Sequence, residues 1–280
     1  MGRKAINTGK AQRTELSPRE QVAASARMVV KIGTNVLMRD DGGVSIGAFY
    51  GIAESLANIR RARREVLLVS SGAVGLGMQR LELPSRPSEL TLVQACAAVG
   101  QSLLMHTYEQ LFFGKKVVAQ LLLSSDDFTS PIRYKNLQNA LHELVKLGVV
   151  PIVNENDSVS VRELVGAFGD NDELSALLAT AVKADWLLLL TDVDGFYVPN
   201  GRKATKLVRT VRKLTPAMED LCDGKGKLGT GGMRSKLRAA RSASESGVHV
   251  AIVNGRHPHA IEWALARKIG TYFPAQKARG

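Results

Sequence analysis

Acidic and amide side chains follow two apolar runs in the middle of the chain. Residues 149–153 are followed by Asn154, Glu155, Asn156 and Asp157, and residues 186–190 are followed by Thr191, Asp192 and Asp194. Apolar runs of this length indicate strands that are buried on both faces of a sheet. Because ligands of open α/β sheets bind beyond the carboxyl ends of the strands, these polar residues are candidates for a binding site.

A helix start lies between the two runs. Asp170, Asn171 or Asp172 can accept hydrogen bonds from the free amides of a first helical turn, and Glu173 suits the positive end of the helix dipole. Leucines at positions 174, 177 and 178 then line one helical face. The acids could be helix caps alone, or they could also belong to a site.

Lysines and glycines occur where other strands end and other helices begin. Lys31 and Gly33 close an apolar strand, Gly72 follows another, and Gly231, Gly232 and Lys236 lie at a predicted helix start. Phosphoryl transfer needs hydrogen-bond donors and cations on the transferred group, and it needs little covalent help from the protein.

These residue types could therefore serve phosphoryl transfer. The glycines would supply backbone amides, Lys31 and Lys236 the positive charge, and Asp172 an anchor that holds the two lysines in line. Two alternatives remain open from the sequence alone. Lys236 could be a solvated helix residue, and Lys31 could cross a sheet edge so that its ammonium group reaches water.

Strands and helices alternate along the chain to position these residues. Strands are predicted at 28–32, 66–69, 117–123, 149–153, 186–190 and 249–253. Helices are predicted at 47–64, 90–112, 137–148, 233–246 and 259–266, with a polar loop over 124–136. This alternation predicts an α/β fold, a three-layer αβα sandwich with a central, mostly parallel open sheet.

The composition limits the class of protein. The chain of 280 residues is 45% apolar, and no apolar run approaches the roughly 18 to 20 residues that a membrane helix needs. Neither a signal-peptide core nor a disulfide framework is visible in a sequence with only two cysteines, so we expect a cytoplasmic protein without a membrane partner. Residues 1–26 read as a mobile basic N-terminal arm, and residues 27–280 as one domain.

The net charge of +12 is local, because residues 201–241 hold twelve bases and three acids. This segment motivates an alternative function, a non-catalytic nucleic-acid-binding protein. It contains no Phe, Tyr or Trp on which a base could stack, so we expect no nucleic-acid partner. A glycine pattern at positions 224, 226 and 229 matches a dinucleotide fingerprint but follows no buried strand, and no Gly-Lys pair continues into a Walker A loop.

Seven segments, in chain order, closely resemble the glutamate 5-kinases of the amino-acid kinase family. They are VVKIGTNVL, SSGAVGLGM, AAVGQ, PIVNENDSV, FGDNDELSALLA, LLLLTDVDGFY and LGTGGMRSK, and the match extends from residue 28 to the C-terminus. The resemblance implies the amino-acid kinase fold and an ATP-dependent phosphorylation of the side-chain carboxylate of L-glutamate to L-glutamyl 5-phosphate. This is the first step of proline biosynthesis, and the resemblance implies Mg²⁺ bound mainly through the nucleotide.

The resemblance also assigns site residues. It makes Lys31, Lys236 and Asp172 the catalytic residues. It assigns glutamate binding to Ser71, Gly72, Asn154, Asp157 and Asn171. It assigns ATP binding to Lys31, Gly33, Thr191, Asp192, Thr230, Gly231, Gly232, Met233 and Lys236. No residue is assigned as a direct metal ligand.

The sequence departs from the family pattern in a few places. Asn35 stands where a serine is common and Ser235 where a threonine is common. The chain ends at Gly280, so we expect no C-terminal PUA domain, and any regulation through that domain is in doubt. The resemblance further implies a homo-oligomer, a dimer or tetramer. It also makes feedback inhibition by proline an expectation to be tested. Kinases for N-acetylglutamate, aspartate or a nucleoside monophosphate remain the alternatives.

Overall fold

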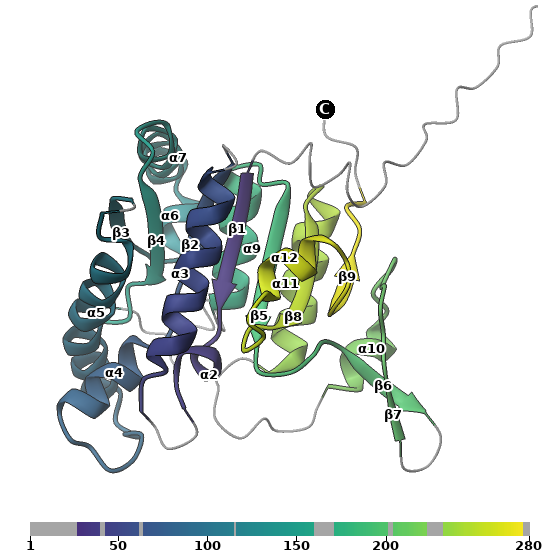
Figure 1. Cartoon of the computed structure of the whole chain (residues 1–280), viewed down its shortest axis with the longest axis horizontal. Coiled ribbons are helices and arrows are strands. Elements are labelled where there is room, and N and C mark those ends of the chain that lie inside the picture. Colours follow the sequence, from purple (N-terminus) through teal and green to yellow (C-terminus); the bar gives the residue numbers. More distant parts are fainter. Residues whose placement is uncertain are drawn as a thin grey trace, which may run out of the picture.

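A single twisted sheet forms the centre of the molecule. The computed structural model describes residues 27–39, 43–61, 64–114, 116–159, 171–200, 204–222 and 232–276. Seven strands lie in the order β3-β4-β2-β1-β5-β8-β9 (Figure 1). They are β1 (Arg27–Ile32), β2 (Glu65–Val69), β3 (Val118–Leu123), β4 (Val150–Glu155), β5 (Trp186–Thr191), β8 (His249–Asn254) and β9 (Thr271–Phe273). Only β9 runs antiparallel to its neighbour, which confirms the predicted mostly parallel sheet.

Helices cover both faces of the sheet. On one face lie α3 (Ile46–Arg61), α5 (Leu90–Phe112) and α12 (Ala260–Leu265), and on the other lie α7 (Pro131–Lys146), α9 (Asn171–Ala181) and α11 (Met233–Glu245) (Figure 1). Each layer buries its own hydrophobic core against the sheet. The predicted three-layer αβα sandwich is therefore confirmed.

Alternation along the central strand decides which side chains face which layer. Met28, Val30 and Ile32 pack in the core beneath α3, α5 and α12, whereas Val29 packs in the core beneath α9 and α11. Because side chains of a strand alternate between the two faces, Lys31 must point to the same side as Val29. The sequence of β1 thus directs a lysine toward the α9 and α11 layer.

Several elements differ from the sequence-based prediction. The loop predicted over 124–136 is wrong, since it contains α6 (Asp126–Thr129) and the start of α7. Helix α7 begins at Pro131, whose fixed φ and missing N–H suit the first helical position. Five further features were not predicted: α2 (Thr34–Leu37), α4 (Ala73–Arg80), α10 (Pro216–Asp220), strand β9 and the hairpin of β6 (Tyr197–Asn200) with β7 (Ala204–Leu207).

Two glycines allow α4 and α5 to cross at very short range. A Cβ atom added at Gly77 would lie 1.8 Å from the carbonyl oxygen of Cys96, and one added at Gly100 would lie 1.7 Å from the carbonyl oxygen of Ala73. Any larger residue at either position would force the helices apart. This crossing fixes the start of α4 against the middle of α5.

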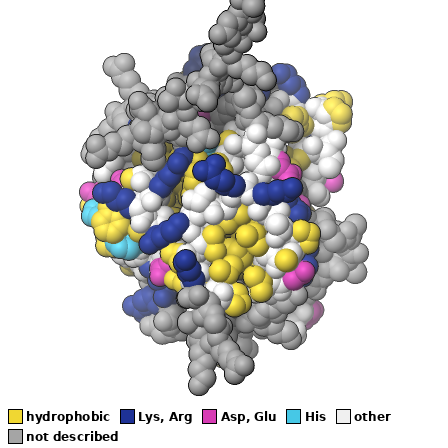
Figure 2. All heavy atoms as spheres, turned by 90° about the vertical axis from the view of Figure 1, so that its right-hand side faces the viewer, with side chains coloured by type: hydrophobic (Ala, Val, Ile, Leu, Met, Phe, Trp, Pro, Cys, Tyr) yellow, Lys and Arg dark blue, Asp and Glu magenta, His cyan; other side chains and the backbone are white. Residues whose placement is uncertain are grey.

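Basic side chains are dispersed over the face that carries β9 and the β6–β7 hairpin. Figure 2 shows Lys and Arg side chains spread among hydrophobic and uncharged ones on this face. Part of the charge of the basic segment is paired internally, because Glu219 lies 2.6 Å from Arg241 and 3.6 Å from Arg238. The predicted N-terminal arm and the glycine-rich residues 223–231 lie outside the described residues.

No helix in the described part of the chain combines the length and the apolar character that crossing a membrane requires.

Candidate active site

Two lysines share one buried carboxylate at the centre of the molecule. Lys31 Nζ lies 2.7 Å from Asp172 Oδ1, and Lys236 Nζ lies 3.1 Å from Asp172 Oδ2. The exposed fractions are 3% for Lys31, 6% for Lys236 and 0% for Asp172. The alternatives of a solvated Lys236 and of a Lys31 that reaches water are therefore wrong.

Three elements bring this cluster together. Strand β1 directs Lys31 toward the α9 and α11 layer, Asp172 lies in the first turn of α9, and Lys236 lies one turn after Gly232, the N-cap of α11. The Ser235 hydroxyl donates a further hydrogen bond of 2.9 Å to Asp172 Oδ2. Asp172 is thus more than a helix cap, because both of its oxygens are bound to cations.

The charges of the cluster do not cancel. Two buried ammonium groups face one carboxylate, so these three side chains together carry a net positive charge in surroundings of low dielectric constant, and Asp192 is a further carboxylate close to Lys236. Burial makes an unbalanced cation costly, and an anion that approaches the cluster offsets this cost. The geometry therefore suits the binding of a negatively charged group between the lysines.

Amide side chains form the second part of the site. Asn171 Nδ2 donates to the Ser70 carbonyl oxygen at 2.9 Å, to Ser71 Oγ at 3.0 Å and to Asn154 Oδ1 at 3.0 Å. The structure therefore brings together three of the predicted glutamate ligands, Ser71, Asn154 and Asn171, all of which are buried. Asn171 also precedes Asp172 on α9, so the amide group and the ionic cluster are neighbours.

Gly72 and Asp157 lie at the ends of the two strands that flank this group. Gly72 follows β2 and has φ of 100°, a left-handed conformation that glycine adopts at little cost, and it is the N-cap of α4. Asp157 follows β4. Burial raises the pKa of Asp157 to about 6, although the nearby charge of Arg86 lowers it in part. Asp157 is thus a carboxylate that changes charge close to neutral pH.

The end of β5 carries the predicted nucleotide residues. Thr191 is buried, and its hydroxyl donates a hydrogen bond of 3.1 Å to Asp192 Oδ1. Asn35 Nδ2 donates a hydrogen bond of 2.9 Å to Asp192 Oδ2. Burial alone would raise the pKa of Asp192, but the hydrogen bonds from Asn35 and Thr191 and the charge of Lys236 lower it overall. Asp192 is therefore held as an anion beside the cluster.

The expected role of the Gly33 amide needs correction. The N–H of Gly33 donates to the carbonyl oxygen of Leu190 at 2.9 Å, so it is not free to bind a phosphate. A Cβ at this position would lie 3.2 Å from the same oxygen, which is a tight contact. Glycine at position 33 therefore lets β1 lie close to β5.

The glycine-rich start of α11 is only partly described. Thr230 and Gly231 lie outside the described residues. Gly232 is the N-cap of α11 with extended backbone angles, and Met233 packs at the edge of the core beneath that layer.

Some residues of the site were not predicted. Gln101 accepts a hydrogen bond of 2.8 Å from Asn154 Nδ2, and Ser70 Oγ lies 2.9 Å from the hydroxyl of Tyr108. Gln101 is the last residue of the AAVGQ segment. The sequence therefore shows that Gln101 belongs to the family pattern, but it does not indicate what the residue does. Asn35 and Ser235 stood out only as departures from that pattern.

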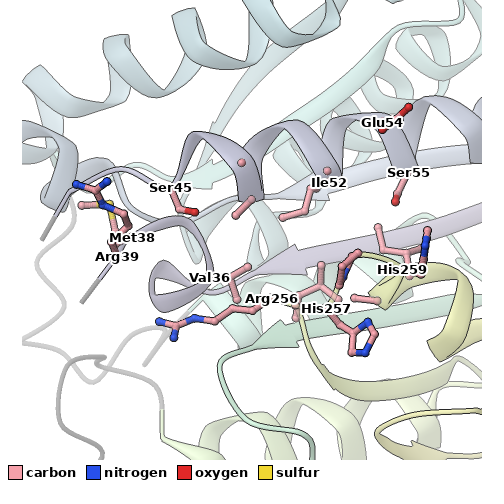
Figure 3. A pocket seen from close by; sticks show the side chains of 18 residues that line it. Val36, Met38, Arg39, Ser45, Ile52, Glu54, Ser55, Arg256, His257 and His259 are labelled. Carbon is pink, nitrogen blue, oxygen red and sulfur yellow. The ribbon is translucent and has the colours of Figure 1, made fainter. Parts of the chain in front are cut away.

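A hollow of about 710 Å³ lies on the other face of the sheet, between α3 and the segment after β8. Figure 3 shows Arg256, His257 and His259 along one side of it and Ser45, Ile52 and Ser55 along the other. Arg256 donates two hydrogen bonds, of 2.9 and 3.2 Å, to the carbonyl oxygen of Asn35. The hollow thus lies beside α2, whose Asn35 binds Asp192, although Lys31, Asp172 and Lys236 do not line it.

Comparison with known proteins places this geometry in context. The model of the amino acid kinase family matches residues 26–254. The chain is 43% identical over 267 residues to a protein of Listeria monocytogenes named glutamate 5-kinase, a match that covers 92% of this chain and 96% of that protein. A protein of the same name from a Nostoc species is 45% identical over 258 residues, covering 89% of this chain and 68% of that protein.

Solved structures share the fold at lower sequence identity. Carbamate kinase from Giardia lamblia bound to AMP-PNP superposes with a TM-score of 0.64 and 21% identity, covering 91% of this chain and all of that chain. UMP kinase from Ureaplasma parvum superposes with a TM-score of 0.60 and 13% identity, covering 89% of this chain and 99% of that chain. These similarities show the fold.

Proposed function

The chain belongs to the amino acid kinase family, and we propose that its Lys31–Asp172–Lys236 cluster is the centre of phosphoryl transfer. The protein is a phosphotransferase that uses ATP to phosphorylate the side-chain carboxylate of L-glutamate. The product is L-glutamyl 5-phosphate, and the reaction is the first step of proline biosynthesis. The observation that carries the proposed centre is the pair of buried lysines on one buried carboxylate.

The reaction needs charge stabilisation more than proton transfer. An oxygen of the ionised glutamate carboxylate attacks the γ-phosphorus of ATP, the bond from this phosphorus to the β,γ-bridging oxygen breaks, and ADP leaves with the electron pair. No proton has to be removed from the nucleophile. The cluster fits this requirement, because Asp172 binds cations with both oxygens and offers no free base.

The two lysines would act on the transferred group from opposite sides. Negative charge on the phosphoryl oxygens and on the leaving oxygen has to be stabilised as the group moves. Asp172 holds the two ammonium groups in fixed positions, so their orientation is set before the substrates bind. Such preorganisation lowers the barrier because little reorganisation is needed during the reaction.

The two substrates would bind on either side of the cluster. Glutamate would occupy the side of β2 and β4, with Ser71, Gly72, Asn154 and Asn171 around it and Asp157 paired with its α-ammonium group. ATP would occupy the side of β5 and α11, where Thr191, Asp192, Gly232 and Met233 are described, and the undescribed Thr230 and Gly231 are further predicted ligands. Lys31 and Lys236 lie between the two sides.

Mg²⁺ would reach the site bound to the phosphates of ATP, as is usual for kinases. The described residues contain no group of three His, Cys, Asp or Glu side chains that could hold a metal ion by themselves. The acids and histidines of the described residues thus form no such cage, and in the proposed reaction the phosphates of ATP would bring the ion to the site.

Other properties stay predictions. We predict a cytoplasmic location and a homo-oligomer, either a dimer or a tetramer, which analytical ultracentrifugation would measure. Inhibition by proline is testable in the same assay as activity. A single catalytic domain is predicted for residues 27–280.

An assay of ADP release with L-glutamate as the acceptor tests the reaction. L-Aspartate, N-acetyl-L-glutamate and uridine monophosphate in turn replace glutamate to test the alternative kinases. We expect ADP release to depend on L-glutamate. Turnover that depends on one of the other acceptors instead would contradict the proposed substrate.

A further inference from the structure

A chain of buried amide groups runs from α5 to α9. Gln101 Oε1 accepts a hydrogen bond of 2.8 Å from Asn154 Nδ2, and Asn154 Oδ1 accepts one of 3.0 Å from Asn171 Nδ2. The exposed fractions of the three residues are 8% for Gln101, 1% for Asn154 and 8% for Asn171. The three amides thus form one connected network inside the protein.

Backbone groups fix the orientation of every amide in this chain. The backbone N–H of Glu155 donates a hydrogen bond of 2.9 Å to the side chain of Asn154. Because an N–H can only donate, the Asn154 atom that faces it must be the oxygen. The Asn154 nitrogen then faces Gln101, so the Gln101 atom at that contact must be its oxygen. At the other end, the carbonyl oxygen of Ser70 can only accept, so the Asn171 atom beside it must be nitrogen.

With these orientations, one donor and one acceptor of the three amides have no partner among the described residues. Among the described residues, Gln101 Nε2 and Asn171 Oδ1 are buried and have no hydrogen-bond partner. A buried polar group without a partner costs roughly 1 to 3 kcal/mol, so both atoms favour a ligand that completes them. A ligand that completed both atoms would bring an acceptor to Gln101 and a donor to Asn171.

The backbone explains why Gln101 reaches the site. Gly100 lets α5 approach the carbonyl oxygen of Ala73, where an added Cβ would lie only 1.7 Å away. Ala73 begins α4 directly after Ser71 and Gly72. The next residue of α5, Gln101, is thereby brought to the carboxyl ends of β2 and β4.

We propose that Gln101 is a substrate-binding residue that donates a hydrogen bond from Nε2 to the α-carboxylate of the amino-acid substrate. Asn171 Oδ1 accepts a hydrogen bond from the α-ammonium group at the other end of the chain. The fixed polarity of the amides thus matches the two α-substituents and sets which way round the substrate lies. The identity of the substrate as glutamate rests on the proposed function, whereas the polarity rests on the hydrogen bonds.

Two variants of Gln101 and two analogues of glutamate test this proposal. Gln101→Glu keeps the size and the acceptor for Asn154 but replaces the donor, and Gln101→Met removes the donor in a chain of similar length. 4-Aminobutyrate is glutamate without its α-carboxylate, and glutarate is glutamate without its α-ammonium group. Ligand-observed NMR measures the dissociation constants, and thermal unfolding checks that each variant is folded.

We expect both variants to bind L-glutamate and glutarate at least about tenfold more weakly than the wild type, because a hydrogen bond to a charged group is lost. Binding of 4-aminobutyrate should change less than about twofold, since it has no α-carboxylate to lose. Equal weakening for all three ligands would indicate a structural role of Gln101 and overturn the proposal. Unchanged glutamate binding in both variants would overturn it as well.

The same experiment separates this proposal from the proposed function. A wild-type protein that binds glutamate in a Gln101-dependent way but releases no ADP would contradict the proposed reaction and support the role of Gln101. If the wild-type protein phosphorylates glutamate but the Gln101 variants show no selective loss of binding, the result would support the proposed reaction and contradict the role of Gln101. Failure to bind any of the three ligands would contradict both.

Discussion

Lys31 and Lys236 bind opposite oxygens of the same carboxylate, at 2.7 and 3.1 Å, although they are far apart in the sequence and come from a strand and a helix. Neither lysine could be buried alone without a large loss of free energy. Asp172 compensates part of their charge through one ion pair with each lysine. In the proposed reaction, these three side chains would set the position of the transferred phosphoryl group.

Replacing Lys236 by alanine should lower kcat by about 10²–10³-fold, because a positioned donor of this kind acts mainly in the transition state. Steady-state ADP release measures kcat, and circular dichroism checks the fold. Arg238→Ala is the matched control on the same helix, since the Arg238 side chain is 58% exposed. A Lys236 variant with turnover close to that of the wild type would remove this lysine from the mechanism.

The affinity for glutamate should depend on pH through Asp157. Its pKa is raised to about 6, and only the ionised form can pair with an α-ammonium group. As the pH falls through this value Asp157 becomes protonated, so kcat/KM for glutamate should fall by about tenfold per unit below pH 6. Rate measurements from pH 5 to 8 reveal the profile.

Asp157→Asn provides the control for this profile. It should flatten the dependence near pH 6 and leave the KM for ATP nearly unchanged. An inflection near pH 6 that persists in the variant would assign the titration to another group.

Arg256 should act on the nucleotide through Asn35. It holds the Asn35 carbonyl oxygen with two hydrogen bonds, and Asn35 in turn donates to Asp192. Loss of these bonds removes a support of α2, so Arg256→Ala should raise the KM for ATP by about two- to tenfold and leave the KM for glutamate unchanged. Arg39→Ala, another exposed arginine beside the same hollow (Figure 3), is the control. An equal change in both KM values would argue against this route.

The crossing of α4 and α5 should tolerate no side chain at position 100. Gly100→Ala places a methyl group within 1.7 Å of a backbone oxygen, so we expect the free energy of unfolding to fall by about 1 to 3 kcal/mol or more. In Gly51→Ala, on α3, the new methyl group meets nothing within 4 Å, and this variant should gain about 0.5 to 1 kcal/mol. Urea unfolding compares the two variants. A neutral Gly100→Ala would show that the helices are not in close contact.

Much of the fold could be predicted because the strands carry clear patterns. The apolar runs that became β1, β2, β4 and β5 are short and bounded by glycine or acids, and each appears in the structure within two residues of its predicted limits. The helix predicted over 90–112 matches α5 at both ends. Elements that depend on tertiary contacts were missed. Strand β9 has only three residues, and α4 forms in a glycine-rich sequence of low helix propensity because it packs on α5.

The site was predictable to the extent that its residues follow strands or begin helices. Lys31, Asp172 and Lys236 were found from such positions and from the resemblance to a family, and Asp172 was expected to hold both lysines. Which oxygen of Asp172 each lysine binds depends on the packing of the helices on the sheet. Gln101 could not be assigned a role from the sequence, since a polar residue on a long helix is common. The role that we propose for Gln101 rests on the close helix crossing at Gly100 and on the direction of two backbone hydrogen bonds.

Trapping of the acyl phosphate with hydroxylamine tests the central claim most directly. The purified protein, ATP and Mg²⁺ are incubated with L-glutamate or N-acetyl-L-glutamate, and the hydroxamate formed is measured. We predict a hydroxamate that requires L-glutamate and ATP, and at least about tenfold less product from N-acetyl-L-glutamate, which lacks the charged amine that Asp157 would bind. Equal formation from both acceptors, or none from L-glutamate, would contradict the account.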